Sequence, residues 1–446
     1  MSLMFVELFS ELRNIEKVVQ MDLCTGCGTC VAFCPQEAIN IKNDDSRGVY
    51  IPEINAAKCN SCGICLKVCP GMEIDFRELN IALFGQEPSN LLGNHLKCFS
   101  GYSNSFNSET TVTVSSGGAA TQLLITALEK GLVDGALVTR MRKDNPLKPE
   151  TIIAETANEI VSAAGSKYCP CPTNLGLKEV LKKEGRFAAV GVPCHIHAIR
   201  KAQQIFPELR KKIPITIGLF CAHATSFKGT EAVLRKLRVS KNQTSKLTYR
   251  GHGWPGYLCV ETTDGRSYRL PLSKSFKSYY PVFDSYLFVP WCCLFCQDHF
   301  NQLADISVGD AWLPEFAGSK IGQSLLVVRS DIGQELVKKA VSSKALTLKP
   351  IQSERVVKSQ HHAVRFKSRD WHVRLSLAVR MRKNPPLHNI NVAQFSSSIG
   401  SYVINIFRMQ SAKLRKTELR TAILSALPLW LYRIYNAILN LVARLP

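Results

Sequence analysis

The feature that most constrains this chain is a cysteine motif that occurs twice near the N-terminus. Residues 24–35 read CTGCGTCVAFCP and residues 59–70 read CNSCGICLKVCP, so each copy has the spacing C-x2-C-x2-C-x3-C-P. In this spacing, three close cysteines bind one four-iron cubane and the fourth binds the neighbouring cubane. The repeat therefore predicts two [4Fe–4S] clusters. Their expected ligands are Cys24, Cys27, Cys30 and Cys69 for one cluster, and Cys34, Cys59, Cys62 and Cys65 for the other.

The residues around these cysteines fit the same interpretation. Gly28 and Gly63 allow the backbone to pass close to a cluster, and the segments 38–41 and 50–55 are expected to be short strands. Residues 1–90 resemble a bacterial dicluster ferredoxin domain, which moves electrons one at a time. A purely structural or zinc-binding role for eight cysteines at this spacing is the weaker alternative.

The rest of the composition indicates a globular protein that works in a reducing compartment. The chain has 446 residues, of which 46% are hydrophobic, so it can form two or three domains with proper cores. The chain has 17 cysteines. Its N-terminus, MSLMFVELFSELRN, lacks the basic and apolar regions of a secretory signal. We therefore expect a cytoplasmic protein, either free or peripheral on the inner face of the membrane, whose cysteines bind metal.

The formal charge of +21 calls for an acidic partner. A surface of this kind attracts nucleic acid, anionic lipid, acidic proteins or acidic small molecules. The sequence has no zinc-finger spacing and no helix-turn-helix pattern, and the basic excess is concentrated toward the C-terminus. We therefore predict that nucleic acid is not a partner.

A Gly-rich segment opens the central region. Within residues 115–140 we predict a loop, a helix from about Ala119 to Lys130, and a buried strand at 135–139. The Ser-Ser-Gly-Gly sequence at the helix start suits an anion, because free N–H groups and the helix dipole favour phosphate there. An ordinary helix cap is the commoner use of such a sequence, so both interpretations stay open.

Three more cysteine segments follow. Residues 186–202 predict a strand, a turn holding Cys194 and a helix, and residues 215–226 predict a strand that ends at Cys221. Ligands of open α/β sheets bind at the carboxyl ends of strands, which is where both cysteines lie. The segment VPWCCLFCQDHF, residues 289–300, contains half of a metal site and no second C-x2-C nearby.

Several of these pieces together resemble a known family. In order they are GYSNS, SSGGAATQLLITALEKGLVDGALV, AAGSKY, VGVPCHIHAIR, IGLFCAHATS, LTYRGHGW and CLFCQDHFNQLADISVGDAW. Over about residues 98–330 they are similar to the family of coenzyme F420 hydrogenase/dehydrogenase beta subunits, which is related to hydroxymethyl chlorophyll a reductase. The resemblance implies an α+β fold in which residues 91–383 form a central α/β domain that binds flavin and iron–sulfur.

The resemblance also implies a site. A third [4Fe–4S] cluster would be held by Cys194, Cys221, Cys293 and Cys296. The FAD site would be formed by Ser116, Gly117, Gly118, Thr121, Gly165, Ser166, Lys167 and Tyr168. Lys167 would offset the charge of the FAD pyrophosphate or polarise the flavin ring, unless it is an ordinary surface lysine.

Further candidates lie close to these residues. His195 and His197, with Lys167, are expected as catalytic groups that donate protons to a substrate; a structural role for each histidine is the alternative. Five cysteines lie outside the implied pattern, and we expect most of them to be buried as small hydrophobic side chains. The pair Cys169 and Cys171 could instead be redox-active; the others are Cys98, Cys259 and Cys292.

Residues 384–446 are expected to be a linker, over 384–403, followed by a basic amphipathic helical extension. The apolar run from Ala422 to Tyr432 is too short to span a bilayer. Its aromatic and basic residues fit a helix lying on a membrane surface, with contact through 413–446. Packing on the protein itself or on a partner is the alternative.

The predicted function is that of an FAD and iron–sulfur oxidoreductase that exchanges electrons between FAD and the clusters, with coenzyme F420 as hydride donor or acceptor. One alternative is a ferredoxin-dependent reductase of an organic substrate. Another is a non-catalytic electron-relay subunit of a larger redox complex. The expected partners are therefore ferredoxin or another electron-transfer protein.

Overall fold

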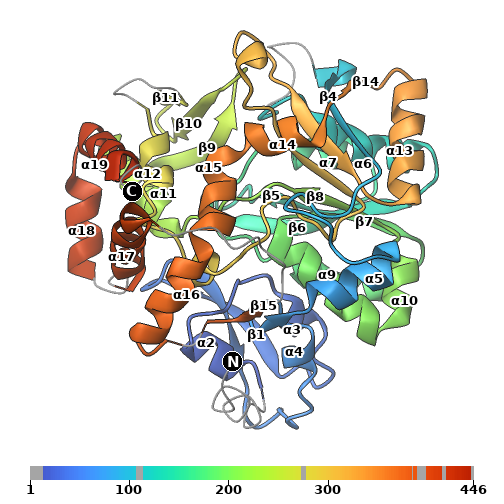
Figure 1. Cartoon of the computed structure of the whole chain (residues 1–446), viewed down its shortest axis with the longest axis horizontal. Helices are drawn as coiled ribbons and strands as arrows, with labels where there is room; N and C mark the ends of the chain where they lie inside the picture. The colour runs from blue at the N-terminus through green and yellow to red at the C-terminus, as the bar shows by residue number, and fades with distance from the viewer. Residues whose placement is uncertain are drawn as a thin grey trace.

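The protein consists of an N-terminal module, a central mixed sheet with helices on both faces, and a group of C-terminal helices (Figure 1). This computed structural model describes residues 14–106, 114–272, 278–383, 385–388, 398–413 and 418–442.

The N-terminal module is built around a two-stranded antiparallel sheet. Strands β1 (Ile39–Asp44) and β2 (Val49–Ile54) pair with each other, which confirms both predicted strands. Helix α2 (Glu16–Gln20) precedes them, and strand β3 (Glu73–Ile74) and helix α5 (Phe76–Phe84) lead out of the module. The matched dicluster spacing and this short sheet fit the expected ferredoxin-like domain.

Two glycines start the one-turn helices that carry the middle cysteines. Gly28 precedes α3 (Thr29–Ala32) and Gly63 precedes α4 (Ile64–Lys67), with φ angles of 88° and 74°. A side chain is disfavoured in this left-handed region, which explains why glycine occupies both positions. The turns direct Cys30 and Cys65 inward, where both are buried.

An eight-stranded mixed sheet forms the centre of the molecule, in the order β14-β4-β13-β12-β8-β7-β5-β6. The pairs β12–β8, β8–β7 and β7–β5 are parallel, whereas the outer pairs are antiparallel. The strands are β4 (Lys97–Ser103), β5 (Gly135–Met141), β6 (Pro149–Ala154), β7 (Phe187–Gly191), β8 (Ile215–Leu219), β12 (Ile306–Asp310), β13 (Ser324–Val328) and β14 (Leu346–Pro350). The parallel centre brings the ends of β7, β8 and β12 to one edge.

Helices pack on both faces of this sheet, as the apolar residues of its parallel strands require. The helices of one face are α6 (Ala119–Glu129), α7 (Ala157–Ser162) and α13 (Asp331–Ser342). Those of the other face are α5, α8 (Leu177–Lys182), α9 (Pro193–Ile205) and α10 (Pro207–Lys212). The hydrophobic core between this second face and its helices also contains Phe33 and Val68 of the N-terminal module, so the module and the sheet share a core.

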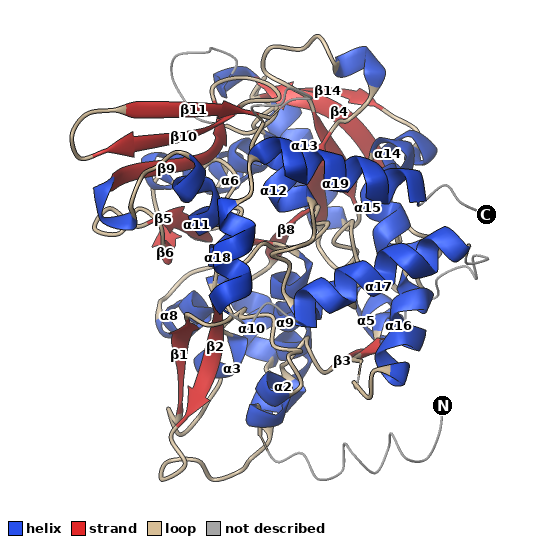
Figure 2. Ribbon diagram, turned by 90° about the vertical axis from the view of Figure 1, so that its left-hand side faces the viewer, coloured by secondary structure: helices blue, strands red, loops and turns tan. Residues whose placement is uncertain are grey.

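A smaller antiparallel sheet lies beside the central one and is separate from it in Figure 2. It contains β9 (Thr244–Gly251), β10 (Tyr257–Thr262) and β11 (Ser267–Pro271). Helices α11 (Phe227–Lys236) and α12 (Tyr280–Asp284) pack on it through a third core.

The C-terminal region is more ordered than the sequence indicated. The predicted linker is wrong from Ile399 onward, where a helix begins, and residues 384 and 389–397 lie outside the described residues. The amphipathic helix expected near the C-terminus is divided into two helices, Glu418–Ala426 and Leu429–Val442. Pro428 separates them, because proline has no N–H to continue the hydrogen-bond ladder of the first helix. The elements are α14 (Ser353–Ser359), α15 (His361–Val364), the π-helix η6 (Arg365–Arg369), α16 (Trp371–Arg380), β15 (Leu387–His388), α17 (Ile399–Lys413), α18 (Glu418–Ala426) and α19 (Leu429–Val442).

These elements pack on the rest of the chain. Strand β15 pairs in parallel with β3 of the N-terminal module, and Tyr432 of α19 is buried in the core under the small sheet. Among the described residues, no helix is both long and apolar enough to cross a membrane.

Candidate functional site

The two N-terminal cysteine sets each surround a cavity. Cavities of about 300 Å³ and 330 Å³ are lined by the first and second predicted sets. The fourth cysteine of each motif, Cys34 or Cys69, lies with the three cysteines of the other motif. Across the described chain, no three His, Cys, Asp or Glu side chains converge on one point as a single metal ion requires. The cysteines are grouped as the spacing predicted.

Backbone amides donate to the sulfurs of these sets. The N–H of Gly26 lies 3.4 Å from Cys24 Sγ, and that of Ala38 lies 3.3 Å from Cys34 Sγ. Burial, with the neighbouring Cys27 sulfur, raises the pKa of the Cys69 thiol to about 12. Such a thiol is neutral at physiological pH unless a bound metal removes its proton. The donor chemistry therefore fits iron–sulfur clusters.

The two cavities differ in their distance from solvent. Cys62 of the second set is exposed, whereas Cys27, Cys30 and Cys69 of the first set are buried. The first set lies against the central domain, where Asn174 N donates to Cys27 O at 2.9 Å. The Asn174 Nδ2 atom also donates to Thr29 Oγ1 at 2.8 Å and to His195 O at 2.9 Å.

Gly28 marks how close this contact is. A Cβ atom at this position would lie 2.8 Å from Leu175 Cγ and 3.0 Å from its backbone nitrogen. At Gly63, in the second motif, nothing lies within 4 Å. The first set is therefore the one that faces the interior of the molecule.

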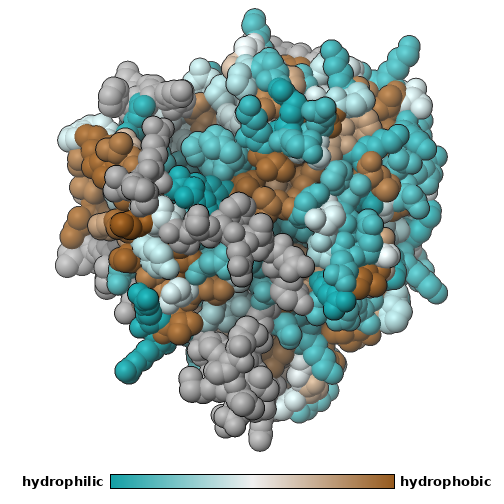
Figure 3. Space-filling model, in the orientation of Figure 1, coloured by the Kyte–Doolittle hydropathy of each residue, from teal (hydrophilic) through white to brown (hydrophobic). Residues whose placement is uncertain are grey.

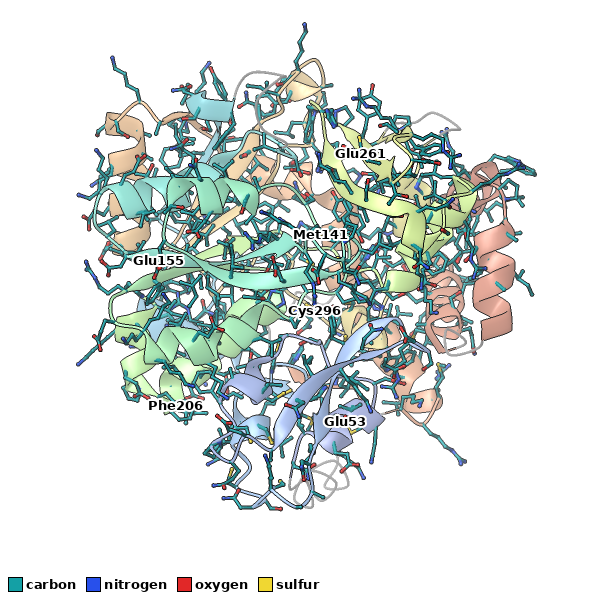
Figure 4. The ribbon with its side chains drawn as sticks, turned by 180° about the vertical axis from the view of Figure 1, so that it is seen from behind. Glu53, Met141, Glu155, Phe206, Glu261 and Cys296 are labelled. Atoms are coloured by element: carbon teal, nitrogen blue, oxygen red, sulfur yellow. The ribbon has the colours of Figure 1, made fainter. Side chains whose placement is uncertain are left out.

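The structure brings the four cysteines of the third set together. Cys194 is the second residue of α9, after β7, and Cys221 follows the end of β8, so both lie at the predicted strand ends. Cys293 and Cys296 lie in and just after the short helix η4 (Trp291–Leu294). Burial raises the pKa of the Cys194 thiol, and the nearby sulfurs of Cys27, Cys221, Cys293 and Cys296 raise it further. Figure 4 shows Cys296 between the N-terminal module and the central sheet.

A lysine that the sequence did not single out contacts this set. Lys367 Nζ lies 2.9 Å from Cys296 Sγ and 3.0 Å from Asp298 O, and the residue is only 2% exposed. Lys367 is 71 residues from Cys296 along the chain. No local pattern around it differs from that of a surface lysine, so only the fold reveals the contact.

The two candidate catalytic histidines hold the loops around the cysteines. His197 Nε2 is 2.8 Å from Asp298 Oδ2, and that carboxylate also accepts a bond from Gln302 N. His195 Nε2 lies 2.9 Å from Cys171 O, and burial lowers the pKa of His195 to about 4. Both side chains are buried, and these contacts fit the structural alternative. Their role as proton donors stays a prediction.

The predicted anion loop and the second flavin loop are in contact. Ser115 Oγ accepts a hydrogen bond from Ser166 N at 2.7 Å, and Ser116 Oγ donates to Gln323 O at 2.9 Å. Gly117 and Gly118 have positive φ angles, 41° and 70°, at the start of α6. No side chain caps this helix start, and Thr121 lies in its first turn. The N–H groups there remain available to a ligand.

Lys167 ties its own loop together. Its Nζ donates to the backbone oxygens of Ala163, Ala164 and Gly165, the last two at 3.2 Å and 2.9 Å. Burial lowers the pKa of Lys167 to about 8. The ammonium therefore shapes the loop between Gly165 and Tyr168 and is not that of an ordinary surface lysine, while its role toward a flavin stays a prediction.

Arg250 is a second residue that sequence analysis missed. Its side chain is 2% exposed and Nη1 lies 2.5 Å from Asp310 Oδ2, at the end of β12. The guanidinium packs 4.8 Å from the ring centroid of Trp254 and 5.3 Å from that of Trp312. Its Nη2 is buried and has no hydrogen-bond partner within the described chain.

These residues fit a phosphate-bearing cofactor. Ser115 Oγ lies 3.4 Å from Arg250 O, and Tyr168 Oη lies 3.4 Å from Arg250 Nη1, so the arginine borders both loops. An unused guanidinium donor next to an uncapped helix start with two glycines is a suitable anion site. The segment LTYRGHGW belonged to the resemblance, but the arginine in it was not predicted.

Of the five remaining cysteines, Cys98, Cys169, Cys259 and Cys292 are buried, as expected for small hydrophobic side chains. Cys171 is partly buried, and its Sγ lies 3.3 Å from Cys169 O. Cys171 is close enough to both Cys194 and Lys167 to interact electrostatically with each.

Several known proteins are similar to this chain. The chain is 30% identical over 267 residues to the beta subunit of coenzyme F420 hydrogenase from Methanosarcina barkeri, covering 58% of this chain and 84% of that protein. It is 28% identical over 337 residues to a subunit of the F(420)H(2) dehydrogenase of Methanosarcina mazei, covering 72% and 83% of the two chains. A chain of the F420-reducing [NiFe] hydrogenase complex from Methanosarcina barkeri superposes with a TM-score of 0.51 at 26% identity, covering 68% and 98%.

Three family models match successive segments of the chain. A 4Fe-4S dicluster domain matches residues 23–71. The N-terminal and C-terminal models of the coenzyme F420 hydrogenase/dehydrogenase beta subunit match residues 101–178 and 184–354. The chain therefore belongs to the family of coenzyme F420 hydrogenase/dehydrogenase beta subunits and carries a 4Fe–4S dicluster domain in front of the family's own region.

Proposed function

We propose that this protein is an iron–sulfur flavoprotein oxidoreductase that passes electrons between FAD and three [4Fe–4S] clusters, with coenzyme F420 as hydride donor or acceptor. The observation that carries the proposal is a continuous series of cysteine sets from the surface to the loops at the start of α6. Cys62 at one end is exposed, and the loops of Ser115 and Ser166 lie at the other end.

Neighbouring members of the series are close enough for their sulfurs to interact electrostatically. Cys65 of the second set interacts with Cys30 of the first, and Cys27 of the first set interacts with Cys194 of the third. Cys194 in turn interacts with Cys171, which lies next to Lys167. Iron–sulfur clusters held at these sets would form an electron-transfer path across the molecule.

The chain supplies suitable groups for the flavin. The free N–H groups at the start of α6, the glycines Gly117 and Gly118 and the Nη2 atom of Arg250 would hold the pyrophosphate. Asp310 fixes the arginine, and Trp254 and Trp312 enclose it. When bound, FAD supplies the chemistry that links two-electron hydride transfer with one-electron steps.

Two observations favour coenzyme F420 over other hydride carriers. The relatives at 30% and 28% identity are named for F420. The net charge of +21 also suits an acidic molecule such as the polyanionic tail that F420 carries. Ferredoxin or another electron-transfer protein would then dock where Cys62 is exposed, at the outer end of the series.

The test is anaerobic reduction of the purified full chain with reduced F420, reduced ferredoxin and NADPH, one donor at a time. We expect bound FAD, and bleaching of its absorbance by reduced F420 followed by reduction of the clusters. Bleaching by ferredoxin alone would favour a ferredoxin-dependent reductase of an organic substrate. Protein that holds clusters but no flavin would contradict the proposal and favour an electron-relay subunit of a larger complex.

A second proposal concerns where the protein works. Helix α19 exposes Trp430, Ile434, Ile438 and Leu441 along one side, and Figure 3 shows an apolar patch over α18 and α19. The opposite side packs inward through Tyr432 and Leu439. We propose that this stripe lies on the surface of an anionic membrane. Burial of the apolar side chains and attraction of the basic protein to anionic lipid would both contribute to binding.

Co-sedimentation with vesicles tests this contact. Wild type should bind vesicles that contain anionic lipid, and a variant with Trp430→Ser and Ile434→Ser should lose most of this binding. Replacing Lys178, which is on another part of the surface, by Met serves as the control. Equal binding by wild type and the double variant would contradict the membrane contact and favour a protein partner for the stripe.

A further inference from the structure

The C-terminal segment from η6 to α16 closes over the third cysteine set. It lies beyond residue 354, where the family match ends. Trp371 Nε1 donates to Phe295 O at 3.0 Å, and Arg374 Nε donates to Leu294 O. The segment thereby binds the backbone of the loop that carries Cys293 and Cys296.

Lys367 is the residue of this segment that reaches a sulfur. The π-helix η6 carries it, and such irregular helices are frequent at functional sites. Its two hydrogen bonds in the described chain go to Cys296 Sγ and Asp298 O. The Oδ2 atom of the Asp298 carboxylate accepts bonds from His197 and Gln302 instead.

The N-terminal sets lack an equivalent contact among the described residues. Their sulfurs accept bonds from the neutral amides of Gly26 and Ala38. Lys201, which influences Cys69 electrostatically, donates in the described chain to the backbone oxygens of Cys69 and Glu73 and not to a sulfur. A full positive charge in contact with sulfur therefore distinguishes the third set.

This charge has a direct consequence for electron transfer. The reduction potential of an iron–sulfur cluster depends on its net charge and on the hydrogen bonds to its sulfurs. Accepting one electron adds one negative charge, and a buried cation stabilises the more negative state because the interior screens charge weakly. The contact with Lys367 therefore favours the reduced state of the site.

We propose that Lys367 is a positioning residue that raises the reduction potential of the third cluster above that of the same site without it. The inference rests on the proposed function, since it requires a cluster at Cys194, Cys221, Cys293 and Cys296. Lys367 would thereby make reduction of this site easier than it would be without the lysine.

An anaerobic redox titration followed by electron paramagnetic resonance tests the role of Lys367. In the full chain, Lys367→Met should make the one-electron reduction of one cluster at least tenfold less favourable, a fall of about 59 mV. The other two clusters should keep their potentials. The matched control is Lys236→Met, because within the described residues Lys236 donates to the backbone oxygens of Ser425 and Leu427 and to no sulfur. The control should shift no cluster.

Two more variants keep the test decisive if Lys367→Met loses the cluster. Lys367→Arg keeps the charge and should hold the potential near that of wild type, whereas Lys367→Gln keeps a donor without charge and should lower it. Equal potentials in the Arg and Gln variants, or an unchanged potential in Lys367→Met with full iron, would overturn the role of Lys367. Wild type with only about eight irons per chain would instead overturn the third cluster and with it the proposed function.

Discussion

The N-terminal cysteine sets and the third set are built in different ways. The first two sets come from one contiguous stretch, residues 24–69, in which each short loop brings three cysteines to one cavity. The third set takes Cys194 and Cys221 from the ends of two strands and Cys293 and Cys296 from a distant loop. Spacing alone specifies the first kind of site, whereas the second kind exists only once the sheet has formed.

The same contrast extends to their surroundings. The N-terminal sulfurs receive hydrogen bonds from amides within a few residues, such as Gly26 and Ala38. The third set receives its donor from Lys367, and its loop is held by Trp371 and Arg374. Because metal binding at such a site is linked to folding, changes in the C-terminal segment should affect the third set first.

The largest expected effect separates the two kinds of site by removing one ligand. Cys221→Ala should lose about four of the roughly twelve irons per chain, because three thiolates hold a cubane poorly. The spectroscopic signals of the two N-terminal clusters should persist. Iron analysis and electron paramagnetic resonance measure both quantities.

Cys292→Ala is the matched control for this variant, since Cys292 is adjacent to the proposed ligand Cys293 and lies outside the four-cysteine set. It should retain all the iron. Loss of all three clusters in Cys221→Ala would mean that the N-terminal sets do not form locally, and the comparison would fail.

The next prediction concerns the segment from η6 to α16, which packs over the third cysteine set. Arg374 is fully buried and bonds to Leu294 O, Phe366 O and Asn405 Oδ1. Arg374→Met leaves these acceptors unpaired and should cost about 3 kcal/mol of unfolding free energy, measured by urea denaturation. Arg380→Met, at the exposed end of the same helix, is the control and should change little. An equal loss of unfolding free energy in both variants would argue against a specific role of Arg374 in holding this segment.

Asn174 tests the contact between the first set and the central domain. Its side chain and backbone bind Cys27 O, Thr29 Oγ1 and His195 O. Asn174→Ala removes the two side-chain bonds and should cost about 2 kcal/mol. Thermal unfolding of the cluster-loaded protein measures the loss. If the variant matched wild type, the two side-chain bonds of Asn174 would contribute nothing to holding the regions together.

A pH effect is expected from Asp284, at the end of the helix that precedes the third-set loop. Burial raises its pKa to about 6, against the opposing influence of Arg408. A carboxyl whose folded pKa is raised lowers stability as pH rises from about 4 to about 6. Asp284→Asn should therefore be about 1 kcal/mol more stable than wild type at pH 7.5, with a smaller advantage at pH 5.5. An advantage that does not depend on pH would point to another cause.

The smallest effect concerns a surface contact between the same two regions. Lys178 of α8 pairs with Glu37 of the N-terminal module, and both side chains are substantially exposed. Exposed pairs contribute little, so Lys178→Met should change the unfolding free energy by less than about 0.5 kcal/mol. A loss as large as that of Asn174→Ala would show that the module is held by surface charge.

Sequence patterns predicted the local parts of this molecule. The cysteine spacing anticipated both N-terminal sets, and the helix and strand at 119–130 and 135–139 match α6 and β5 closely. The same is true of Cys194 and Cys221 at strand ends. In each case the information lies within a few neighbouring residues.

Sequence patterns failed where distant segments meet. Lys367 reaches Cys296 across 71 residues, and Arg250 reaches Asp310 across 60. The sequence around each basic residue does not indicate that its side chain is buried. Burial depends on segments that are distant in sequence and pack over it in the fold. The start of α17 was missed for a related reason: the polar residues of 384–403 suggested a linker, whereas packing of Tyr402 and Met409 against Leu294 supports a helix there.

The most direct test of a third, fold-built cluster is the iron and acid-labile sulfide content of the anaerobically prepared full chain. Three four-iron clusters predict about twelve of each per chain. A content of about eight, with both N-terminal clusters intact by electron paramagnetic resonance, would contradict the claim that Cys194, Cys221, Cys293 and Cys296 hold a cluster.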